Sequence, residues 1–489
     1  MTAKLEQVDA SKILDALIHL HSSGTAENEP EDLFLKRFLP LPDHGRALEP
    51  AAFLIIGGRG AGKSALFQAL QYPAGIRAIM DVAPKVSREQ IDRTTWLVGY
   101  SSRGTDFPAE MVIRKFSRDR TAFDFQLLWL GLLLRCLHRS KPLLAIQGGP
   151  LQFMLNAPSV SINDVFGTMD AATEEGISLL DRCDKELLEK DKWTFVTYDE
   201  LDKLCASDWE SQTIILRGLI QFWSGHARRW QRLRPKIFLR KDLFERALAG
   251  TDVSKISAQR VELNWTVRGL YALLAKRLVN KDALLKDYLR EVLPDGKEYG
   301  ELGWRPTAPR EEEYRSMIEK MCGPYMGVNP KKGRTFLWIP KHLEDSNGRV
   351  LPRSMIRLFE SAAEMERDAP RAEWPIIIHY TALRGALDKV SVDRFNEIKE
   401  EFLWIEKVRM ALKPLNIKVP AEKLELQRAT DIDWSQEPNT PPERGSYGLL
   451  QFLGELGIFY IRSDGRVDVR DIFLDGLGLK RKGGVKKPF

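Results

Sequence analysis

Residues 57–64 have the sequence Gly-Gly-Arg-Gly-Ala-Gly-Lys-Ser, which fits the pattern G-x-x-x-x-G-K-[ST]. The apolar run Phe53–Ile56 precedes this motif, and the helix-favouring run Ala65–Leu70 follows it. A strand, a glycine-rich turn and a helix in this order aim backbone N–H groups at a phosphate. The pattern therefore predicts an α/β domain with a parallel sheet and a phosphate-binding loop after its first strand.

Each part of this loop has an expected role. Lys63 would neutralise the β- and γ-phosphates of a bound nucleotide, and the Ser64 hydroxyl would ligate Mg²⁺. The residues expected to contact the nucleotide are Gly57, Gly58, Arg59, Gly60, Ala61, Gly62, Lys63, Ser64 and Ala65.

A second apolar strand, Thr194–Tyr198, ends in the acidic pair Asp199-Glu200. We expect Asp199 to hold Mg²⁺ through water and Glu200 to polarise the attacking water. Two adjacent carboxylates suit this chemistry because the metal engages one and leaves the other as a base. The alternative is an ordinary helix N-terminus, where acidic residues are also common.

Between residues 51 and 265 apolar runs alternate with helical patterns, which favours a parallel sheet covered on both faces. The expected strands are Phe53–Ile56, Thr94–Val98, Thr194–Tyr198, Lys236–Leu239 and Arg260–Leu263. Residues Phe125–Leu137 are so apolar that we expect a buried core helix. Glycine- and proline-rich stretches, including residues 323–332, separate the helical segments that follow.

The C-terminal segment has the pattern of a winged helix. Tyr447–Leu456 is helical, and Ile458–Arg462 and Val467–Val469 flank an Asp464-Gly465 turn. We divide the chain into an N-terminal helical segment (1–46), a P-loop core (47–266), a helical lid (267–368) and a winged-helix-like C-terminal domain with a basic tail (369–489).

Charge is uneven along the chain, which has 74 Lys and Arg against 68 Asp and Glu. Residues 211–241 contain eight basic residues and no acidic one, and the last ten residues carry five positive charges and no negative one. Such blocks mark either contacts with phosphate groups or a solvated face.

Several classes of protein are disfavoured. The four Cys never form Cys-x-x-Cys, and the His residues never form His-Glu-x-x-His, which argues against a disulfide scaffold and a zinc enzyme. The longest apolar stretch, Leu127–Leu134, is far short of the ~20 residues that span a bilayer. With no secretory signal pattern at the N-terminus, we expect a cytoplasmic protein without membrane contact.

The order of motifs resembles that of the AAA+ and STAND class of P-loop ATPases, closest to the branch with Orc/Cdc6-like initiators and NB-ARC-type switches. The resemblance rests on the P-loop, on Tyr198–Leu204 and on Ile237–Arg240. It implies ATP and Mg²⁺ as ligands and ATP hydrolysis as the activity. It also implies that Arg240 is a sensor of the γ-phosphate, and that Arg353, after Pro352, approaches the nucleotide from the lid.

More loosely, the chain resembles bacterial ATPases found in anti-phage defence islands, through Phe38–His44 and Gly478–Gly484. This resemblance implies a role in antiviral defence. No arginine finger is evident, and Arg246 and Arg260 are the candidates.

Three functional hypotheses follow. The first is an ATP-hydrolysing switch or motor subunit, working as a homo-oligomer or on a partner effector such as a nuclease. The second is an ATP-gated DNA-binding module, contacting DNA through residues 211–241, the wing residues Arg462 and Arg466, and the basic tail. The third is a scaffold for a partner effector, with a non-hydrolytic regulator as the alternative to an enzyme.

Overall fold

The structure of the chain is a computed structural model that describes residues 2–20, 29–83, 86–102, 107–141, 149–205, 208–248, 256, 259–307, 310–437 and 439–482. The chain divides into one unit of residues Pro40–Asn264 and a second of Met1–Leu39 with Trp265–Phe489. The finer boundaries expected at residues 46, 266 and 368 stay predictions. Most of the polar stretch Ser22–Asp32 and the end of the basic tail lie outside the described residues.

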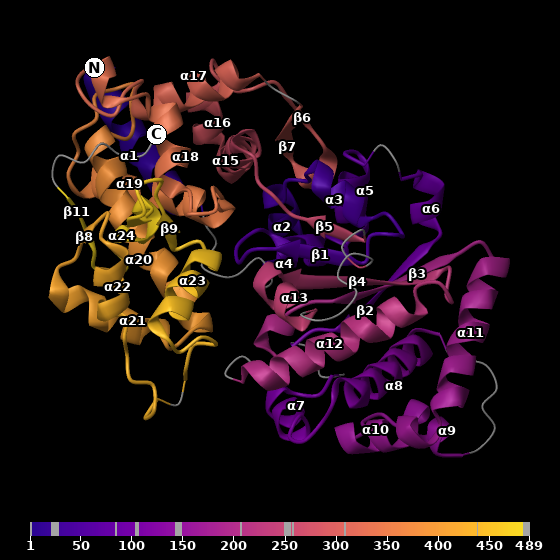
Figure 1. Ribbon diagram of the computed structural model, residues 1–489. Helices are drawn as coiled ribbons and strands as arrows, with labels where there is room; N and C mark the ends of the chain where they lie inside the picture. Colours follow the sequence, from indigo (N-terminus) through magenta and orange to yellow (C-terminus); the bar gives the residue numbers. More distant parts are fainter. Residues whose placement is uncertain are drawn as a thin grey trace. The chain divides into compact units, whose positions relative to one another are not determined.

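The Pro40–Asn264 unit is built on a five-stranded parallel sheet with the order β2-β3-β4-β1-β5 (Figure 1). Its strands are β1 (Leu54–Gly57), β2 (Thr94–Tyr100), β3 (Trp193–Tyr198), β4 (Leu233–Arg240) and β5 (Arg260–Glu262). All five lie where the sequence predicts them. This is the α/β fold with a parallel sheet that the sequence predicts.

The strand order explains where a ligand would lie. The connection from β1 runs past β4 and β3 to β2, whereas β2, β3 and β4 follow one another back toward β1. The connections after β1 and after its neighbour β4 therefore leave in opposite directions. A crevice at such a switch point, at the carboxyl ends of the strands, is where open α/β sheets bind ligands.

Helices cover both faces of this sheet. On one face, Phe67 of α4 (Lys63–Ala69) packs edge-on against Phe238 of β4, with ring centroids 5.7 Å apart. Helix α5 (Pro73–Met80) contacts both α4 and α3 (Pro42–Ala47), and α6 (Arg88–Asp92) precedes β2 in the chain. The opposite face holds α8 (Ala122–Ser140) and α12 (Trp209–His226), which lie side by side (Figure 1).

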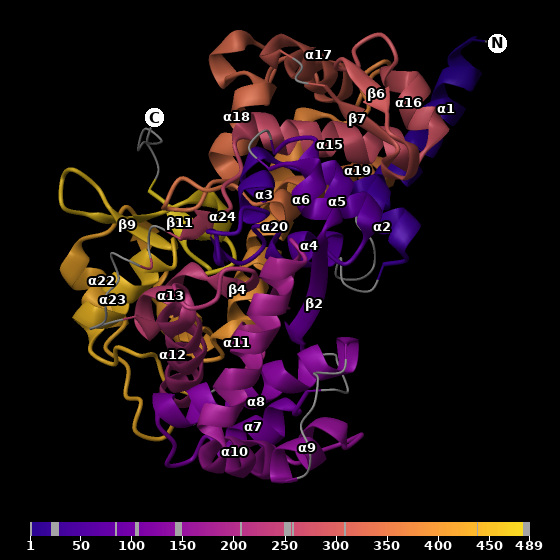
Figure 2. The same cartoon turned by 90° about the vertical axis from the view of Figure 1, so that its right-hand side faces the viewer.

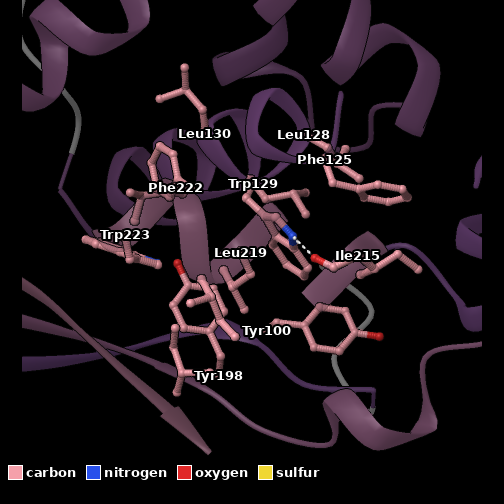
Figure 3. Packing of buried hydrophobic residues seen from close by; sticks show 14 of the residues in the cluster. Tyr100, Phe125, Leu128, Trp129, Leu130, Tyr198, Ile215, Leu219, Phe222 and Trp223 are labelled. Carbon is pink, nitrogen blue, oxygen red and sulfur yellow. Dashed lines mark hydrogen bonds between the residues drawn. The ribbon is translucent and has the colours of Figure 1, made fainter. Parts of the chain in front are cut away.

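The core between α8, α12 and the sheet is aromatic (Figure 3). Trp129 of α8 meets Tyr100 and Tyr198 edge-on, at centroid distances of 5.8 and 5.9 Å. Its indole N–H donates to the Ile215 carbonyl oxygen at 3.3 Å, so the buried polar atom is satisfied. The burial of α8 confirms the expected core helix. Other helices on this side are α7 (Glu110–Phe116), α9 (Gly149–Asn156), α10 (Ile162–Ala171), α11 (Thr173–Glu189) and α13 (Lys241–Ala247).

In the second unit, helices close to each other in space come from distant parts of the sequence. The N-terminal α1 (Thr2–Ile18) packs against α19 (Pro352–Asp368) and α16 (Ala283–Leu289), and α2 (Glu31–Arg37) packs against α15 (Val267–Lys281). Ile13, Leu14 and Leu17 of α1 are buried, because they form the apolar stripe that the sequence shows. Figure 2 gives a second view of α15–α19, where the remaining helices are α17 (Glu311–Cys322) and α18 (Thr335–Leu343).

The C-terminal residues have the predicted helix followed by a hairpin. Helix α23 (Ser446–Glu455) ends before Gly457, whose φ of 81° favours glycine. Strands β9 (Phe459–Ile461) and β10 (Val467–Val469) pair antiparallel around the Asp464-Gly465 turn. The expected order of a helix and a hairpin is thus confirmed, and a winged-helix domain stays a prediction. The other elements here are α20 (Tyr380–Glu401), α21 (Ile405–Leu412), β8 (Lys418–Val419), α22 (Lys423–Ala429), α24 (Asp471–Leu474) and β11 (Lys480–Arg481).

Two features were not predicted. Strands β6 (Gly296–Glu298) and β7 (Trp304–Pro306) form a short antiparallel hairpin. Residues 324–335, in a stretch that the sequence reads as a separator, form a hydrogen-bonded loop in which Tyr325 bridges to Arg334. In the described part of the chain no helix has both the length and the apolarity needed to cross a bilayer.

Candidate nucleotide-binding site

The loop after β1 has the geometry of a phosphate cradle. Gly60 and Gly62 have φ of 77° and 96°, which only glycine adopts freely, and Gly62 directly precedes α4. A Cβ at Gly57 would lie 3.0 Å from that of Ala61, whereas a Cβ at Gly58 would meet no atom within 4 Å. Gly60 and Gly62 thus allow the backbone to turn, Gly57 allows a close approach to Ala61, and open space remains beside Gly58.

Lys63 lies within this loop. Its Nζ donates to the carbonyl oxygens of Gly57 and Gly58, each at 3.0 Å. The backbone carbonyls of the loop therefore hold the ammonium group next to the place where a phosphate would bind. The position fits the predicted role of Lys63.

Asp199 follows β3 and is buried, with 4% of its surface exposed. Burial raises its pKa to about 6, although a backbone hydrogen bond at Glu200, a hydrogen bond from the Ser64 side chain and the charge of Lys63 oppose the rise. Its own N–H donates to the Tyr100 carbonyl at 3.1 Å, which fixes the end of β3 to β2. The structure thus brings together Lys63, Ser64 and Asp199, which come from two strands that are not neighbours.

This donor set suits Mg²⁺. A hard cation of this size is commonly bound by one or two protein oxygens together with phosphate and water. Ser64 and Asp199 supply a hydroxyl and a carboxylate that lie near enough for Ser64 to lower the pKa of Asp199, and a cation there would relieve the cost of burying the carboxylate. Among the described residues, no group of three or more His, Cys, Asp and Glu side chains could hold a metal ion, so no denser site competes.

Glu200 is held more firmly than the sequence suggests. Its Oε2 accepts from Ser101 Oγ at 3.1 Å, Ser102 N at 3.1 Å and Ser102 Oγ at 2.6 Å, and its Oε1 pairs with Lys203. Its φ of 58° is unusual for a residue with a side chain, and such strain is concentrated at functional sites. To take a proton from water, Glu200 would have to give up one of these partners.

Arg240 lies beside the phosphate loop. It is in register with Gly57 across the β1–β4 pair, and it is buried. Its guanidinium pairs with Asp242 through two bonds, Nε to Oδ1 at 3.1 Å and Nη2 to Oδ2 at 2.6 Å. Burial alone would raise the pKa of Asp242, but Arg240 lowers it overall. Arg240 is thus a fixed charge at the position expected of a sensor.

The remaining predicted arginines have partners of other kinds. Arg353 belongs to the second unit, where its Nη1 donates to Glu397 of α20 at 3.0 Å. Arg394 also binds Glu397, and the two arginines lower the pKa of this carboxyl although burial would raise it. Arg246 stacks over the ring of Trp209 at 4.4 Å, and Arg260 is half-buried in β5.

The basic stretch 211–241 is not a free cationic surface. Lys236 is completely buried and donates to the carbonyls of Glu49 and Ala52, at 2.6 and 2.7 Å. The other contacts of this stretch are Arg217 with Ala247, Arg229 with Asp181, Arg232 with Asp191, Arg234 with Ala227, Arg240 with Asp242 and Lys241 with Glu262. Only Arg228 is exposed without a partner among the described residues. The stretch mainly stabilises the fold.

The wing arginines are also paired. Arg466 bonds to Asp464 at 2.6 Å, and Arg462 reaches the buried Asp468 at 3.3 Å. Arg481 of the basic tail pairs with Asp468 and Asp471. The wing aspartates therefore neutralise the three arginines that the sequence suggested as DNA contacts.

Sequence reasoning missed four residues of the site: Ser101, Ser102, Lys203 and Asp242. The two serines directly follow β2, and a polar pair at the end of a strand was a usable signal. It could not be used without knowing that β2 neighbours β3. Lys203 and Asp242 lie three and two residues from Glu200 and Arg240, so local spacing offered a hint for both.

No family model matches this chain, and no curated protein matches it. Among solved structures, the Orc2 protein of Aeropyrum pernix in ADPNP–ADP complexes is similar, with 15% identity over 94% of this chain and 95% of that chain and a TM-score of 0.37. The Orc1 protein of Aeropyrum pernix in complex with DNA has 13% identity over 94% and 95%, with a TM-score of 0.34. Cdc6p from Pyrobaculum aerophilum has 14% identity over 87% and 86%, with a TM-score of 0.27. We take no residue role from these likenesses.

Proposed function

We propose that this chain binds ATP with Mg²⁺ and hydrolyses it, and that it works as an AAA+/STAND-like nucleotide switch. The observation that carries the proposal is the meeting of Lys63 and Ser64 with Asp199, directly before Glu200. The P-loop brings a cation and a hydroxyl, and the end of β3 brings two carboxylates. Phosphoryl transfer needs this set of positioned charges more than it needs covalent chemistry.

In the proposed mechanism, the loop amides and Lys63 bind the β- and γ-phosphates. Ser64 and Asp199 would hold Mg²⁺, which supplies positive charge where the transferred phosphoryl group develops negative charge. Glu200 orients a water molecule and accepts its proton after releasing a serine or Lys203. Arg240 responds to the γ-phosphate from the end of β4.

We further propose that Arg353 links nucleotide state to the second unit. Its present partner is Glu397 of α20, in the same unit as the winged-helix-like residues. If Arg353 left Glu397 and bound a phosphate group instead, α20 would lose this ion pair and shift. Local changes of charge contacts of this kind drive many protein switches. We propose that this step controls either assembly into a homo-oligomer or binding of a partner effector, in a role in antiviral defence.

ATP binding is the first test. We expect Lys63→Ala to weaken binding of a fluorescent ATP analogue by about 100-fold. The reason is that the phosphates lose their charged contact with the only lysine of the loop. Lys115→Ala, which removes an exposed lysine of α7, is the control and should bind as wild type does. Equal affinity of the Lys63→Ala variant and wild type would overturn the proposal.

Molecular size tests the switch. In the Glu200→Gln background, which would keep ATP bound, light scattering after gel filtration measures the mass with and without ATP. A mass that rises with ATP supports a homo-oligomer, and an unchanged mass supports a monomeric switch that acts on a partner.

The second hypothesis, ATP-gated binding of DNA through the C-terminal domain, predicts that deletion of residues 480–489 weakens DNA binding and flattens its salt dependence. The pairing of Arg462, Arg466 and Arg481 with aspartates gives this version no added support.

A further inference from the structure

Residues 324–335 form a loop between α17 and α18 whose two sides are joined by one antiparallel bridge, and we call this loop the finger. Its two sides are joined by the Tyr325–Arg334 bridge, by Met326 N to Gly333 O at 3.0 Å and by Thr335 N to Pro324 O at 3.0 Å. At the tip, Asn329 caps a single turn over Pro330–Lys332. The backbone of the finger is thus hydrogen-bonded almost to its end.

The base of the finger is anchored in the second unit. Met326 and Phe336 are buried on its two sides. Arg384 of α20 donates to the Met326 carbonyl at 2.7 Å, and Tyr271 of α15 donates to the Phe336 carbonyl at 2.6 Å. A Cβ at Gly327 would lie 2.6 Å from Lys332 Cγ, so this glycine lets the lysine stem lie across the loop. The finger is therefore preformed.

The tip of the finger is exposed. Residues 328–334 are all exposed, and Val328 has 93% of its surface exposed. Lys331, Lys332 and Arg334 have no ion pair or hydrogen-bond partner for their side chains among the residues that the structure describes. From Lys320 to Leu343 the sequence has no acidic residue, so no carboxylate within the loop offsets these charges.

A rigid loop that presents three unpaired cations suits a polyanion. A membrane surface is a poor fit, because interfacial binding needs a larger apolar face and stable polybasic attraction needs about four to eight cations. A protein interface is also a poor fit, since interface centres are rich in aromatic residues and depleted in lysine. Nucleic acid fits best, because its phosphates attract lysine and arginine and the major groove of a DNA duplex, about 12 Å wide, admits a protein segment.

We propose that the finger binds duplex DNA, with Lys331, Lys332 and Arg334 on the phosphates and Val328 in a groove. A DNA duplex is favoured over an RNA duplex because side chains do not reach into the deep, narrow major groove of RNA. This proposal does not depend on ATP hydrolysis, and its site is separate from the wing and the tail.

Anisotropy of a labelled, mixed-sequence DNA duplex of about 30 base pairs tests the proposal over a salt series from about 50 to 200 mM. We expect the full-length triple variant Lys331→Ala/Lys332→Ala/Arg334→Ala to bind at least about tenfold more weakly. Its slope of log K against log salt should shrink by about two to three, because each phosphate contact contributes about 0.9. An unchanged affinity and slope would overturn the proposal.

Two matched variants separate position from total charge. Arg228→Ala/Lys297→Ala/Lys418→Ala removes three exposed cations that also lack partners among the described residues, but from three different elements. It should keep most of the affinity, and a loss equal to that of the finger variant would contradict a local site. The thermal midpoints of both variants should match wild type, because exposed unpaired side chains contribute little to stability.

Val328→Ala tests the groove contact. It should lower the affinity by about threefold without changing the salt slope, because it removes apolar contact and no charge. No change would overturn the placement of Val328. Equal or tighter binding of a single strand or an RNA duplex would overturn the assignment to duplex DNA.

Discussion

The phosphate loop and the finger both contain glycine and lysine, but their lysine side chains have opposite surroundings. Each combines glycines and lysine before a helix, at Gly57–Ser64 before α4 and at residues 324–335 before α18. In the first, Lys63 turns inward onto two carbonyls, beside a buried carboxylate. In the second, Lys331 and Lys332 point their charges into solvent. The first suits one small anion and the second a long one.

The surroundings of a cationic side chain indicate its role better than the density of positive charge in the sequence does. Residues 211–241 have more positive charge than residues 320–343, and both lack acidic residues. In the first stretch, strand β4 and the ends of α12 and α13 place cations next to carbonyls and carboxylates. In the second, a loop projects its cations away from the rest of its unit.

A large effect is expected at Asp199. Asp199→Asn removes the carboxylate for Mg²⁺, and we expect Mg²⁺-dependent ATP turnover to fall by at least about 100-fold. DNA binding by the finger should not change. A coupled-enzyme assay measures the first quantity, and duplex anisotropy measures the second. A variant with normal turnover would show that Asp199 is not the metal ligand.

Lys236 tests the claim that residues 211–241 serve the fold. Lys236→Ala leaves the buried carbonyls of Glu49 and Ala52 without their donor and opens a cavity, so we expect a loss of stability of about 2–4 kcal/mol. Urea unfolding measures this loss. Arg228→Ala, in the exposed turn after α12, is the control and should change stability by less than about 0.5 kcal/mol. Similar stability of both variants would contradict the structural role.

Lys203 sharpens the account of Glu200. Removing the ammonium group frees Glu200 Oε1, so we expect Lys203→Met to raise kcat about threefold. The free energy of this change is smaller than that of a single hydrogen bond to a charged group. KM should stay unchanged, because Lys203 does not hold the phosphates in the proposed mechanism. Lys203→Arg keeps the ion pair and should behave as wild type. A fall in kcat for Lys203→Met would instead make Lys203 part of the active arrangement.

The last prediction is a pH dependence of stability in the second unit. Lys276 is completely buried, donates to the carbonyls of Leu302 and Trp304, and has a pKa lowered to about 7, chiefly by burial. An unfolded chain binds this proton up to pH about 10, so the lysine costs stability below pH 7, and the cost fades as pH rises from about 7 to 10. The stability of wild type relative to Lys276→Met should rise over that window. A constant difference in thermal midpoint would contradict it.

The sequence predicted the sheet well because its strands are short apolar runs between turns and helices. Phe53–Ile56 and Thr194–Tyr198 are so apolar that burial on both faces was the natural interpretation. It did not predict β6 and β7, since Gly296–Glu298 has no apolar alternation to mark a strand. The contact of α1 with α19 joins residues that are more than 300 positions apart, and no local pattern encodes such a pair.

In the site, local motifs predicted Lys63, Ser64, Asp199 and Glu200. The partners of these residues depend on strand order, which is why Ser101 and Ser102 were missed. The finger was missed for a related reason. Its glycines and proline indicate a turn, but the exposure of Lys331 depends on the anchoring of Met326 and Phe336 below it.

The measurement that tests the central claim most directly is ATP turnover by Glu200→Gln beside its ATP binding. Wild type should hydrolyse ATP, and the variant should bind ATP with similar affinity while its turnover falls by about 10²–10⁴-fold, the contribution of a positioned general base. Single-turnover release of phosphate, measured with equal bound ATP, isolates the chemical step. Unchanged turnover, or wild type that neither binds nor hydrolyses ATP, would contradict the account.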